Sequence, residues 1–260
     1  MRLLVMLCAL TLTAQTVTVA IRSTAQPWKN AAGRQVDLNE EIDPSHTAII
    51  ICDMWDKHWC RGATERVGVL APKIAHVIAE ARKRGVLIIH APSETMDFYK
   101  DSPQRRAILA FPAVKPPVAL TLPDVPLPID DKNGGCDTGD SMYKAWTREH
   151  PAIPIAPEDL VSDNGAEIYN ALQARGIRHL LVSGVHTNMC VLNRTFAIKQ
   201  MSRWNMRTIL LRDLTDAMYN PEDAPHVSHD AGTQLVIEHI EKYWCPTMLS
   251  GELLRALVAR

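Results

Sequence analysis

The sequence lacks a dominant charge. Its 260 residues contain 28 Lys and Arg against 29 Asp and Glu, which gives a formal net charge of −1. It also lacks long runs of like charge and short internal repeats. A protein that binds nucleic acid or an anionic membrane needs a basic surface, so the balance argues against both. With 47% hydrophobic and 22% charged residues, the chain has the composition of a globular protein with one sizeable core.

The first apolar run, residues 3–10, is too short to span a bilayer. It follows a single positive charge and precedes small residues, which is typical of a secretory signal. We therefore expect residues 1–25 to hold a secretory signal and an N-terminal segment. Candidate cleavage sites follow Ala14, Ala20 and Ala25. The protein would then be exported, to the periplasm or the extracellular space. The alternative is a cytoplasmic protein in which the alternating residues 16–21 form a buried strand.

Cysteine is scarce, with six in the chain, and Cys8 would leave with the signal. The five that remain are Cys52, Cys60, Cys136, Cys190 and Cys245. Because five is odd, at least one thiol has no intramolecular partner. In an oxidising compartment a free thiol has a reason, which can be catalysis, burial or an intermolecular bridge. A bridge between Cys60 and Cys136 is reasonable, but the sequence alone does not fix the connectivity.

Apolar runs rich in β-branched residues predict the strands of a sheet. These runs are residues 47–52, 85–89, 179–183 and 207–211. Such continuous runs suit parallel strands that are buried on both faces. Helical patterns cover residues 69–84, 163–175, 191–204 and 234–244. The alternation predicts an α/β fold of three layers, α/β/α, with a Rossmann-like parallel sheet and helices on both faces.

Residues 110–140 interrupt this alternation. They are rich in Pro and contain Gly134 and Gly135. Long loops on compact α/β domains are usually functional lids or disordered segments. We therefore expect a single domain over residues 26–260, with an insertion at about 110–140 near its active face.

Reactive side chains follow the predicted strands. In an open parallel sheet, ligands bind at the carboxyl ends of the strands. The residues there are Asp53, His90, the segment 184–190 and Asp213. A strand ends at Gly184, a tight turn follows, and a helix opens near Cys190. Helix N–H groups would lower the pKa of that thiol and hold a developing oxyanion. The alternative is an inert, buried cysteine.

Residues 184–191, with the pattern Gly-Val-x-Thr-x-x-Cys-Val, resemble the nucleophile turn of the isochorismatase-like cysteine hydrolases. Residues 47–54 resemble that family's first core strand with its catalytic Asp, and residues 207–213 resemble its later strand. The match covers residues 46–250 apart from the long loop. Family members include nicotinamidases, N-carbamoylsarcosine amidases and isochorismatases, and their fold is a Rossmann-like sheet flanked by helices.

The resemblance implies a hydrolase of a small amide, imide or related C–N bond, with a thioester-type intermediate on Cys190. Asp53 would act as the base. The turn and its oxyanion donors would be Val185, His186, Thr187 and Cys190. No cofactor is required by this chemistry. The expected partners are a small-molecule substrate and, as in other family members, further copies of the chain in a homo-oligomer.

One family feature is missing. The family's Lys precedes the helix before the nucleophile strand, and the corresponding residues 150–160 contain no Lys. That Lys would lower the pKa of the thiol and orient the Asp. Candidates for an activating cation are Lys144, His186 and His90. Without a replacement, the chain would be a degenerate member that acts as a small-molecule binding or accessory protein.

A second dense cluster follows the first core strand. The candidates for an aromatic pocket wall are Trp55, Trp59 and Phe98. The candidates for a divalent metal, as O, N and S ligands of zinc type, are Asp56, His58, Cys60 and His90. Metal-binding relatives carry an Asp-x-His pair after the second strand, where this chain has His90-Ala91-Pro92, so that site is not matched. The alternative is packing of the Trp residues and a disulfide at Cys60.

Overall fold

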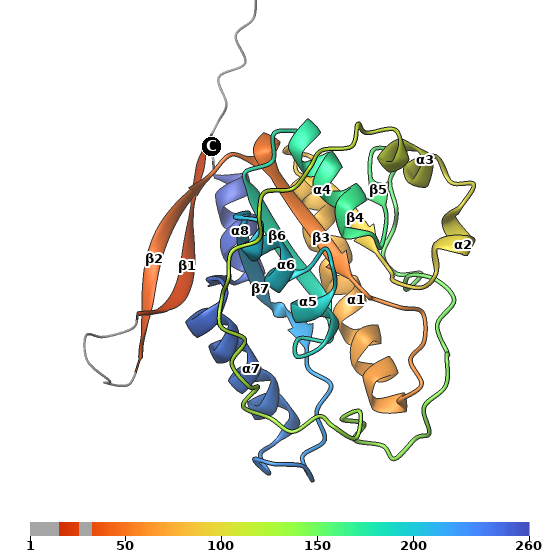
Figure 1. The fold of residues 1–260 in the computed structure, drawn as a ribbon, viewed down its shortest axis with the longest axis vertical. Helices are drawn as coiled ribbons and strands as arrows, with labels where there is room; N and C mark the ends of the chain where they lie inside the picture. The colour runs from red at the N-terminus through yellow and green to blue at the C-terminus, as the bar shows by residue number, and fades with distance from the viewer. Residues whose placement is uncertain (1–15, 26–32, 260) are drawn as a thin grey trace, which may run out of the picture.

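The computed structural model describes residues 16–25 and 33–259. Eight strands of this described part form one mixed sheet in the order β2-β1-β8-β7-β6-β3-β4-β5 (Figure 1). They are β1 (Val17–Ala25), β2 (Arg34–Ile42), β3 (Thr47–Cys52), β4 (Leu87–Ala91), β5 (Leu160–Val161), β6 (His179–Val185), β7 (Arg207–Asp216) and β8 (Thr247–Met248). Strands β3 to β8 pair in parallel. The predicted parallel sheet is present in β3 to β8, and at one edge β1 runs antiparallel to both β2 and β8.

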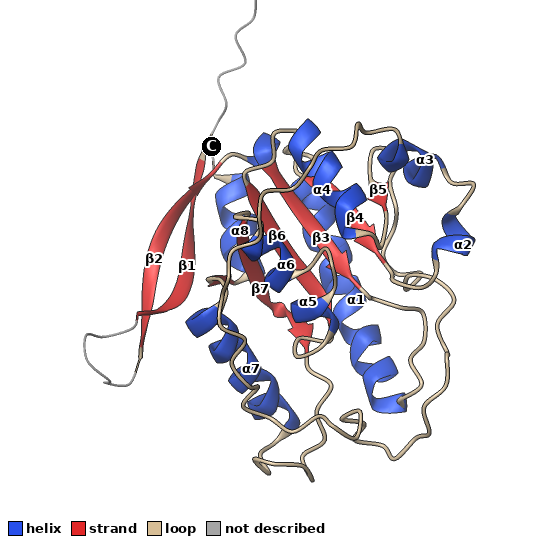
Figure 2. Cartoon of the chain, in the orientation of Figure 1, coloured by secondary structure: helices blue, strands red, loops and turns tan. Residues whose placement is uncertain are grey.

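Helices cover both faces of this sheet, as the three-layer prediction requires (Figure 2). One face carries α1 (Arg61–Arg82) and α8 (Ser250–Val258). The other carries α4 (Gly165–Ala174), α5 (Cys190–Asn193), α6 (Ile198–Arg203) and α7 (His229–Tyr243). The short helices η1 (Pro44–His46), α2 (Met96–Tyr99) and α3 (Pro103–Leu109) lie in connections. The α/β/α architecture is confirmed.

Strand β3 shows why its sequence is apolar throughout. Ala48, Ile50 and Cys52 pack into the core on the α4–α7 side, whereas Ile49 and Ile51 pack into the core beneath α1 and α8. Because successive side chains of a strand point to opposite faces, a strand between two helical layers buries every residue.

Several elements differ in extent from their predicted ranges. Helix α1 begins eight residues earlier, at Arg61 rather than 69, and its added turns bury Ala63 and Val67 while Arg61 and Arg66 contact the insertion. The single helix expected over 191–204 is two short ones, α5 and α6. The chain leaves α5 at Arg194, whose backbone is extended at φ −60° and ψ 152°.

The insertion is longer than expected. Residues 110–159, all of them described, contain no helix or strand beyond one bridge between Trp55 and Glu149 (Figure 2, tan). The segment runs along the α6 side of the domain, where the N–H of Leu120 donates to the carbonyl of Arg203 at 2.9 Å. It therefore reaches the face of the sheet that carries α5 and α6.

The N-terminal strand bears on the expected signal segment. Val19 and Ile21 of β1 are buried in the core, so the sheet includes residues before the expected domain boundary at 26. Cleavage after Ala20 or Ala25 would remove part or all of β1, whereas Ala14 lies outside the described residues. Export of the protein stays a prediction. Across residues 16–25 and 33–259, no helix is long and apolar enough to cross a membrane.

Candidate active site

Asp53 and Cys190 meet because β3 and β6 are neighbours in the sheet. Cys52 pairs with Gly184 in the parallel register. A Cβ at Gly184 would lie 2.0 Å from the carbonyl oxygen of Cys52, and its φ of +108° also favours glycine. The glycine therefore lets the two strand ends touch. Asp53 follows β3 directly, and the turn after β6 brings the Cys190 thiol close enough for the Asp53 charge to raise its pKa.

A third residue, Arg194, completes this group. Its Nε donates to Oδ2 of Asp53 at 2.9 Å, while Oδ1 of Asp53 accepts the backbone N–H of Ser93 at 2.7 Å. On its outer side, Nη2 of Arg194 lies 3.5 Å from Oε1 of the exposed Glu94. The buried carboxylate thus has a cation on one oxygen and an amide donor on the other. We call Cys190, Asp53 and Arg194 the Cys190 site.

The sequence analysis missed Arg194, although a signal was present. Arg194 lies four residues after Cys190, and its N–H donates to the Cys190 carbonyl at 3.0 Å. Side chains four residues apart lie on the same face of a helix. A cation at that spacing from a candidate nucleophile, in a predicted helix, was a reason to place the two together.

The ionisation of the site differs from expectation. Burial, and then the charge of Asp53, raise the pKa of Cys190 well above its ordinary range. Burial also raises the pKa of Asp53, although Arg194 opposes this rise. The expectation that the helix start lowers the pKa of Cys190 is wrong, because α5 has only four residues and burial outweighs its N–H groups. The neutral thiol is the resting form of Cys190.

None of the three predicted activating cations acts on the thiol. Nζ of Lys144 donates to the carbonyl oxygen of Glu94 at 2.9 Å. His186 is neutral, because burial lowers its pKa to about 3. His90 is charged but has other partners. The cation that lies against Asp53 is Arg194.

His90 belongs to a separate buried network. Its Nδ1 lies 2.6 Å from Oε2 of Glu149, and its Nε2 lies 3.0 Å from Oδ2 of Asp159. Arg82 donates to the same Asp159 from Nε at 2.9 Å and from Nη2 at 2.7 Å. Burial favours neutral His90, but the charges and hydrogen bonds of the two carboxylates outweigh it and raise the pKa of His90 to about 9. We call these four residues the His90 network.

The four predicted metal ligands do not gather. Cys60 is bonded to Cys136 in a disulfide, so its sulfur is not a thiolate. The carboxylate of Asp56 accepts from Thr147, and Nδ1 of His58 accepts the Cys60 N–H at 3.1 Å. Among the described residues, the His, Cys, Asp and Glu side chains close enough to share an ion are Cys60, Cys136 and Asp137, and the first two form the disulfide. The expected ligand set is therefore wrong, and the reasonable Cys60–Cys136 pairing is present.

The expected aromatic wall lies elsewhere. Trp55 stacks on Trp146 with ring centroids 4.4 Å apart, and its Nε1 donates to the Ser93 carbonyl. Trp59 packs beside the disulfide. Phe98 is 56% exposed, with the guanidinium of Arg148 over its ring. These rings are not among the residues that line the cavity at Cys190.

That cavity has a volume of about 730 Å³ and lies between the nucleophile segment and the insertion. Its lining consists of Asn188, Met189, Cys190, Asn193, Arg194 and Lys199 on one side, and of Asp124, Val125, Pro126, Leu127 and Asp131 on the other. Lys199 pairs with Asp124 at 2.7 Å, and Nδ2 of Asn188 donates to Asp131 at 2.8 Å. The insertion is thus one wall of the space into which Cys190 opens.

The backbone N–H groups of the turn have different directions. The N–H of Thr187 donates to the carbonyl of Asp216 at 2.9 Å, so it is not free for an oxyanion. The N–H of His186 faces the Cys190 sulfur and opposes part of the rise in its pKa. Within the described residues, the Cys190 N–H has no hydrogen-bond acceptor. Of the predicted oxyanion donors, the N–H groups of His186 and Cys190 thus lack an oxygen acceptor among the described residues, whereas that of Thr187 is taken.

Comparison with solved structures finds proteins of the same fold. A cysteine hydrolase from Pseudomonas syringae pv. phaseolicola 1448A is 19% identical, has a TM-score of 0.56, and aligns over 83% of this chain and 94% of its own. A protein assigned as an isochorismatase from Burkholderia xenovorans LB400 is 16% identical, has a TM-score of 0.50, and aligns over 82% of this chain and 87% of its own. No protein-family model and no curated protein matches the sequence. The chain has the fold of the isochorismatase-like cysteine hydrolases, as its motifs predict.

Proposed function

We propose that the protein is a cysteine-dependent hydrolase of a small amide, imide or related C–N bond. The observation that carries the proposal is the meeting of Cys190, Asp53 and Arg194 beside one cavity. A thiol, a buried carboxyl group and a cation are the parts that acyl transfer to sulfur needs. The fold shared with a cysteine hydrolase supports the same function.

The first half of the reaction forms a thioester. Asp53, ionised beside Arg194, takes the proton of the Cys190 thiol as the sulfur attacks the carbonyl carbon of the substrate. The free N–H of Cys190 donates to the developing oxyanion. When the C–N bond breaks, protonated Asp53 gives its proton to the departing nitrogen. An amine or ammonia leaves, and the acyl group stays on the sulfur.

The second half consumes water. Asp53, again ionised, takes a proton from a water molecule that attacks the thioester carbon. The S–C bond breaks, the carboxylic acid product leaves, and Cys190 recovers its proton from Asp53. The raised pKa of Cys190 suits this cycle, because the proton moves only when a substrate is present to accept the sulfur's electrons.

Arg194 has two tasks in this scheme. Its charge holds the pKa of Asp53 lower than burial alone would, which favours the ionised form of the base. Its hydrogen bond at 2.9 Å also fixes Oδ2, so the carboxylate faces the thiol in one orientation. In this chain Arg194 therefore does what the missing Lys would do.

The test is turnover of a panel of small amides and imides, followed by release of ammonia or amine. We expect Cys190→Ala to lower kcat/KM by about 10³-fold or more, since the covalent step is lost. Cys245→Ala is the matched control, because Cys245 is a free, buried cysteine outside the cavity and its loss should leave turnover unchanged.

Equal turnover by wild type and Cys190→Ala would remove the covalent role. A wild-type protein that hydrolyses no member of the panel, yet binds one of them in calorimetry, would instead support a binding or accessory protein.

A further inference from the structure

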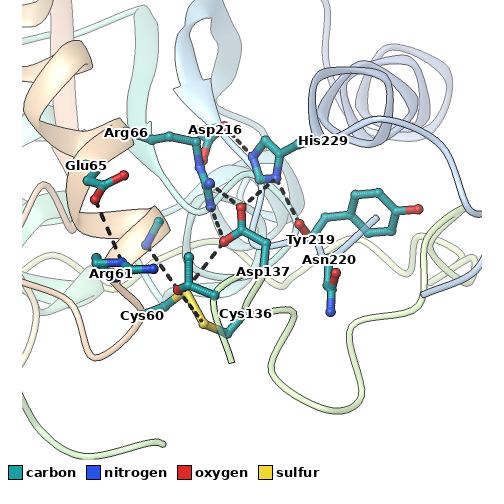
Figure 3. A network of polar contacts seen from close by, with 12 residues as sticks. Cys60, Arg61, Glu65, Arg66, Cys136, Asp137, Asp216, Tyr219, Asn220 and His229 are labelled. Carbon is teal, nitrogen blue, oxygen red and sulfur yellow. Dashed lines mark hydrogen bonds and ion pairs between the residues drawn. A yellow bond between two sulfur atoms is a disulfide. The ribbon is translucent and has the colours of Figure 1, made fainter. Parts of the chain in front are cut away.

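The disulfide lies next to a polar network that leads to the nucleophile turn, residues 185–190 (Figure 3). Cys60 is the residue that precedes α1 and is buried, whereas Cys136 is half-buried in the insertion. The bond thus joins the rigid helical layer to a segment of 50 residues, 110–159, that has almost no regular structure. Two chains of contacts continue from Cys136 to the turn.

The first chain of contacts runs through the residues before Cys136. Gly135, at φ +64°, lies so close to the backbone of Met218 that a Cβ there would be 2.3 Å from its carbonyl oxygen. Asn188 of the turn exchanges two hydrogen bonds with the Met218 backbone, at 2.8 and 3.0 Å. Its Nδ2 also donates to Asp131 at 2.8 Å. Asn188 is therefore held between the insertion and the segment after β7.

The second chain of contacts starts at the residue after Cys136. The carboxylate of Asp137 accepts two hydrogen bonds from Arg66, one from Nη1 at 2.6 Å and one from Nη2 at 3.3 Å (Figure 3). Nε of the same Arg66 donates to Asp216 at 2.9 Å. The carbonyl of Asp216 accepts the N–H of Thr187, and His229 holds the other carboxylate oxygen of Asp216 at 2.9 Å. Through Arg66, the insertion thus reaches the backbone of the turn.

We propose that the Cys60–Cys136 disulfide holds the nucleophile turn in place and releases it when the bond is reduced. Arg66 and Asp131 are the positioning residues of this redox-sensitive fastening. A dithiol reductant would supply two electrons and two protons: the S–S bond breaks, Cys60 and Cys136 become thiols, and the reductant becomes a disulfide. Cys136 is the accessible end for this exchange, because Cys60 is buried.

Reduction acts on the turn through the loss of both chains of contacts. Asp131 and Asp137 flank Cys136 in a segment without helix or strand, and the disulfide is the covalent bond that ties this stretch to the start of α1. Once they move, Asn188 loses its bond to Asp131, and Arg66 loses Asp137 and so holds Asp216, the partner of Thr187, less firmly. The wall formed by residues 124–127 and 131 then leaves the cavity. The effect on turnover depends on the proposed hydrolase function; the effect on the turn does not.

Hydrogen exchange measured by mass spectrometry tests the fastening without a substrate. We expect amides in peptides covering residues 186–191 to exchange about 10-fold faster or more after reduction by dithiothreitol, and to recover on reoxidation. The variant with Cys60→Ser and Cys136→Ser should match the reduced wild type and ignore the reductant.

A double variant, Arg66→Ala with Asp131→Ala, keeps the disulfide but removes both positioning side chains. It separates the positioning of the turn from an effect on general stability. This variant should already exchange quickly at 186–191, and reduction should add little, because contacts in one network are not additive. Leu253→Ala, in the core beneath α8 and outside both chains of contacts, is the control for general destabilisation and should keep the response to reduction.

Unchanged exchange at 186–191 after complete reduction would overturn the proposal. So would an equal rise throughout the sheet, which would make the bond only a general staple. Where amide turnover is measurable, it should fall with the same reductant dependence as the exchange rises. Turnover that stays constant while exchange rises would overturn the regulatory part. If the wild type shows no turnover, only the proposed hydrolase function is contradicted. Hydrogen exchange still tests whether the disulfide holds the turn, because it needs no substrate.

Discussion

The Cys190 site and the His90 network lie side by side at the ends of adjacent strands and use similar parts. In each, buried carboxylates meet cations: Asp53 meets Arg194 in one, and Glu149 and Asp159 meet His90 and Arg82 in the other. They differ in whether a reactive group is left without a partner and open to a ligand. Both ring nitrogens of His90 are bonded to carboxylates, whereas the Cys190 thiol opens on a cavity.

The difference separates structural from chemical use of the same groups. A closed set of two acids and two cations has no proton to give to a ligand, so its electrostatics stabilise the fold. An open set with a thiol, one carboxylate and one cation keeps a proton that can move. Substitutions should therefore split cleanly: changes in the Cys190 site should remove activity, and changes in the His90 network should lower stability.

The largest expected effect is that of Asp53→Asn on chemistry. Loss of the base should lower kcat by about 10²–10⁴-fold with a small change in KM, because a positioned base contributes that much to proton transfer. Steady-state kinetics on any amide turned over by the wild type measure it. Asp159→Asn, the same change in the neighbouring network, should leave kcat within a few-fold. If both lowered kcat equally, the two regions would not be functionally distinct.

The second prediction concerns stability. His90→Gln should lower the free energy of unfolding by about 3–5 kcal/mol near pH 6, since it leaves buried carboxylates without their cation. Urea denaturation measures the loss, with Lys73→Gln on exposed surface of α1 as a control of similar charge change.

The pH dependence of that loss follows from the sign of the shift. Folding raises the pKa of His90 from 6.5 to about 9, so its stabilisation is complete below pH 6.5 and is lost as the pH rises through about 9. The difference between wild type and His90→Gln should therefore shrink by about 3 kcal/mol between pH 6 and 9. A difference independent of pH would show that His90 is neutral.

The smallest effect is expected for Arg194, which acts through Asp53. Arg194→Gln should lower kcat/KM by about 10–100-fold, and it should move the acidic limb of the pH–rate profile upward, because the pKa of Asp53 rises without its cation. Arg194→Lys should restore part of both. A fall in activity with an unmoved acidic limb would assign Arg194 to packing alone.

Sequence patterns predicted the parts of the fold that depend on burial. Continuous apolar runs located β3 and, within a few residues, β4, β6 and β7, and parallel neighbours then required that Asp53 and Cys190 share an edge of the sheet. The antiparallel β1–β2 pair was not predicted, because the residues of β2 are mostly exposed and polar and carry no strong apolar pattern.

Side-chain partners were harder to predict, because they depend on where irregular chain lies. The His90 network joins His90 of β4 to Glu149 and Asp159, which both lie in the last part of the insertion, residues 110–159. No spacing in the sequence marks that meeting. The predicted direction of the shift in the pKa of Cys190 was wrong for a related reason. It was argued from a helix start, whereas the depth of burial beside Asp53 decides it.

The pairing of β6 with β3 also has a consequence for the order in which the protein is made. Asp53 and Arg194 are 141 positions apart, and three strands of the sheet, β4, β5 and β6, are synthesised between them. A ribosome-bound chain that has completed β5 already contains Asp53 and Ser93, but it contains neither the Cys190 thiol nor the Arg194 guanidinium. The Cys190 site therefore assembles only when the sixth strand inserts beside the third. Reactivity at Cys190 thus reports that the centre of the sheet is complete.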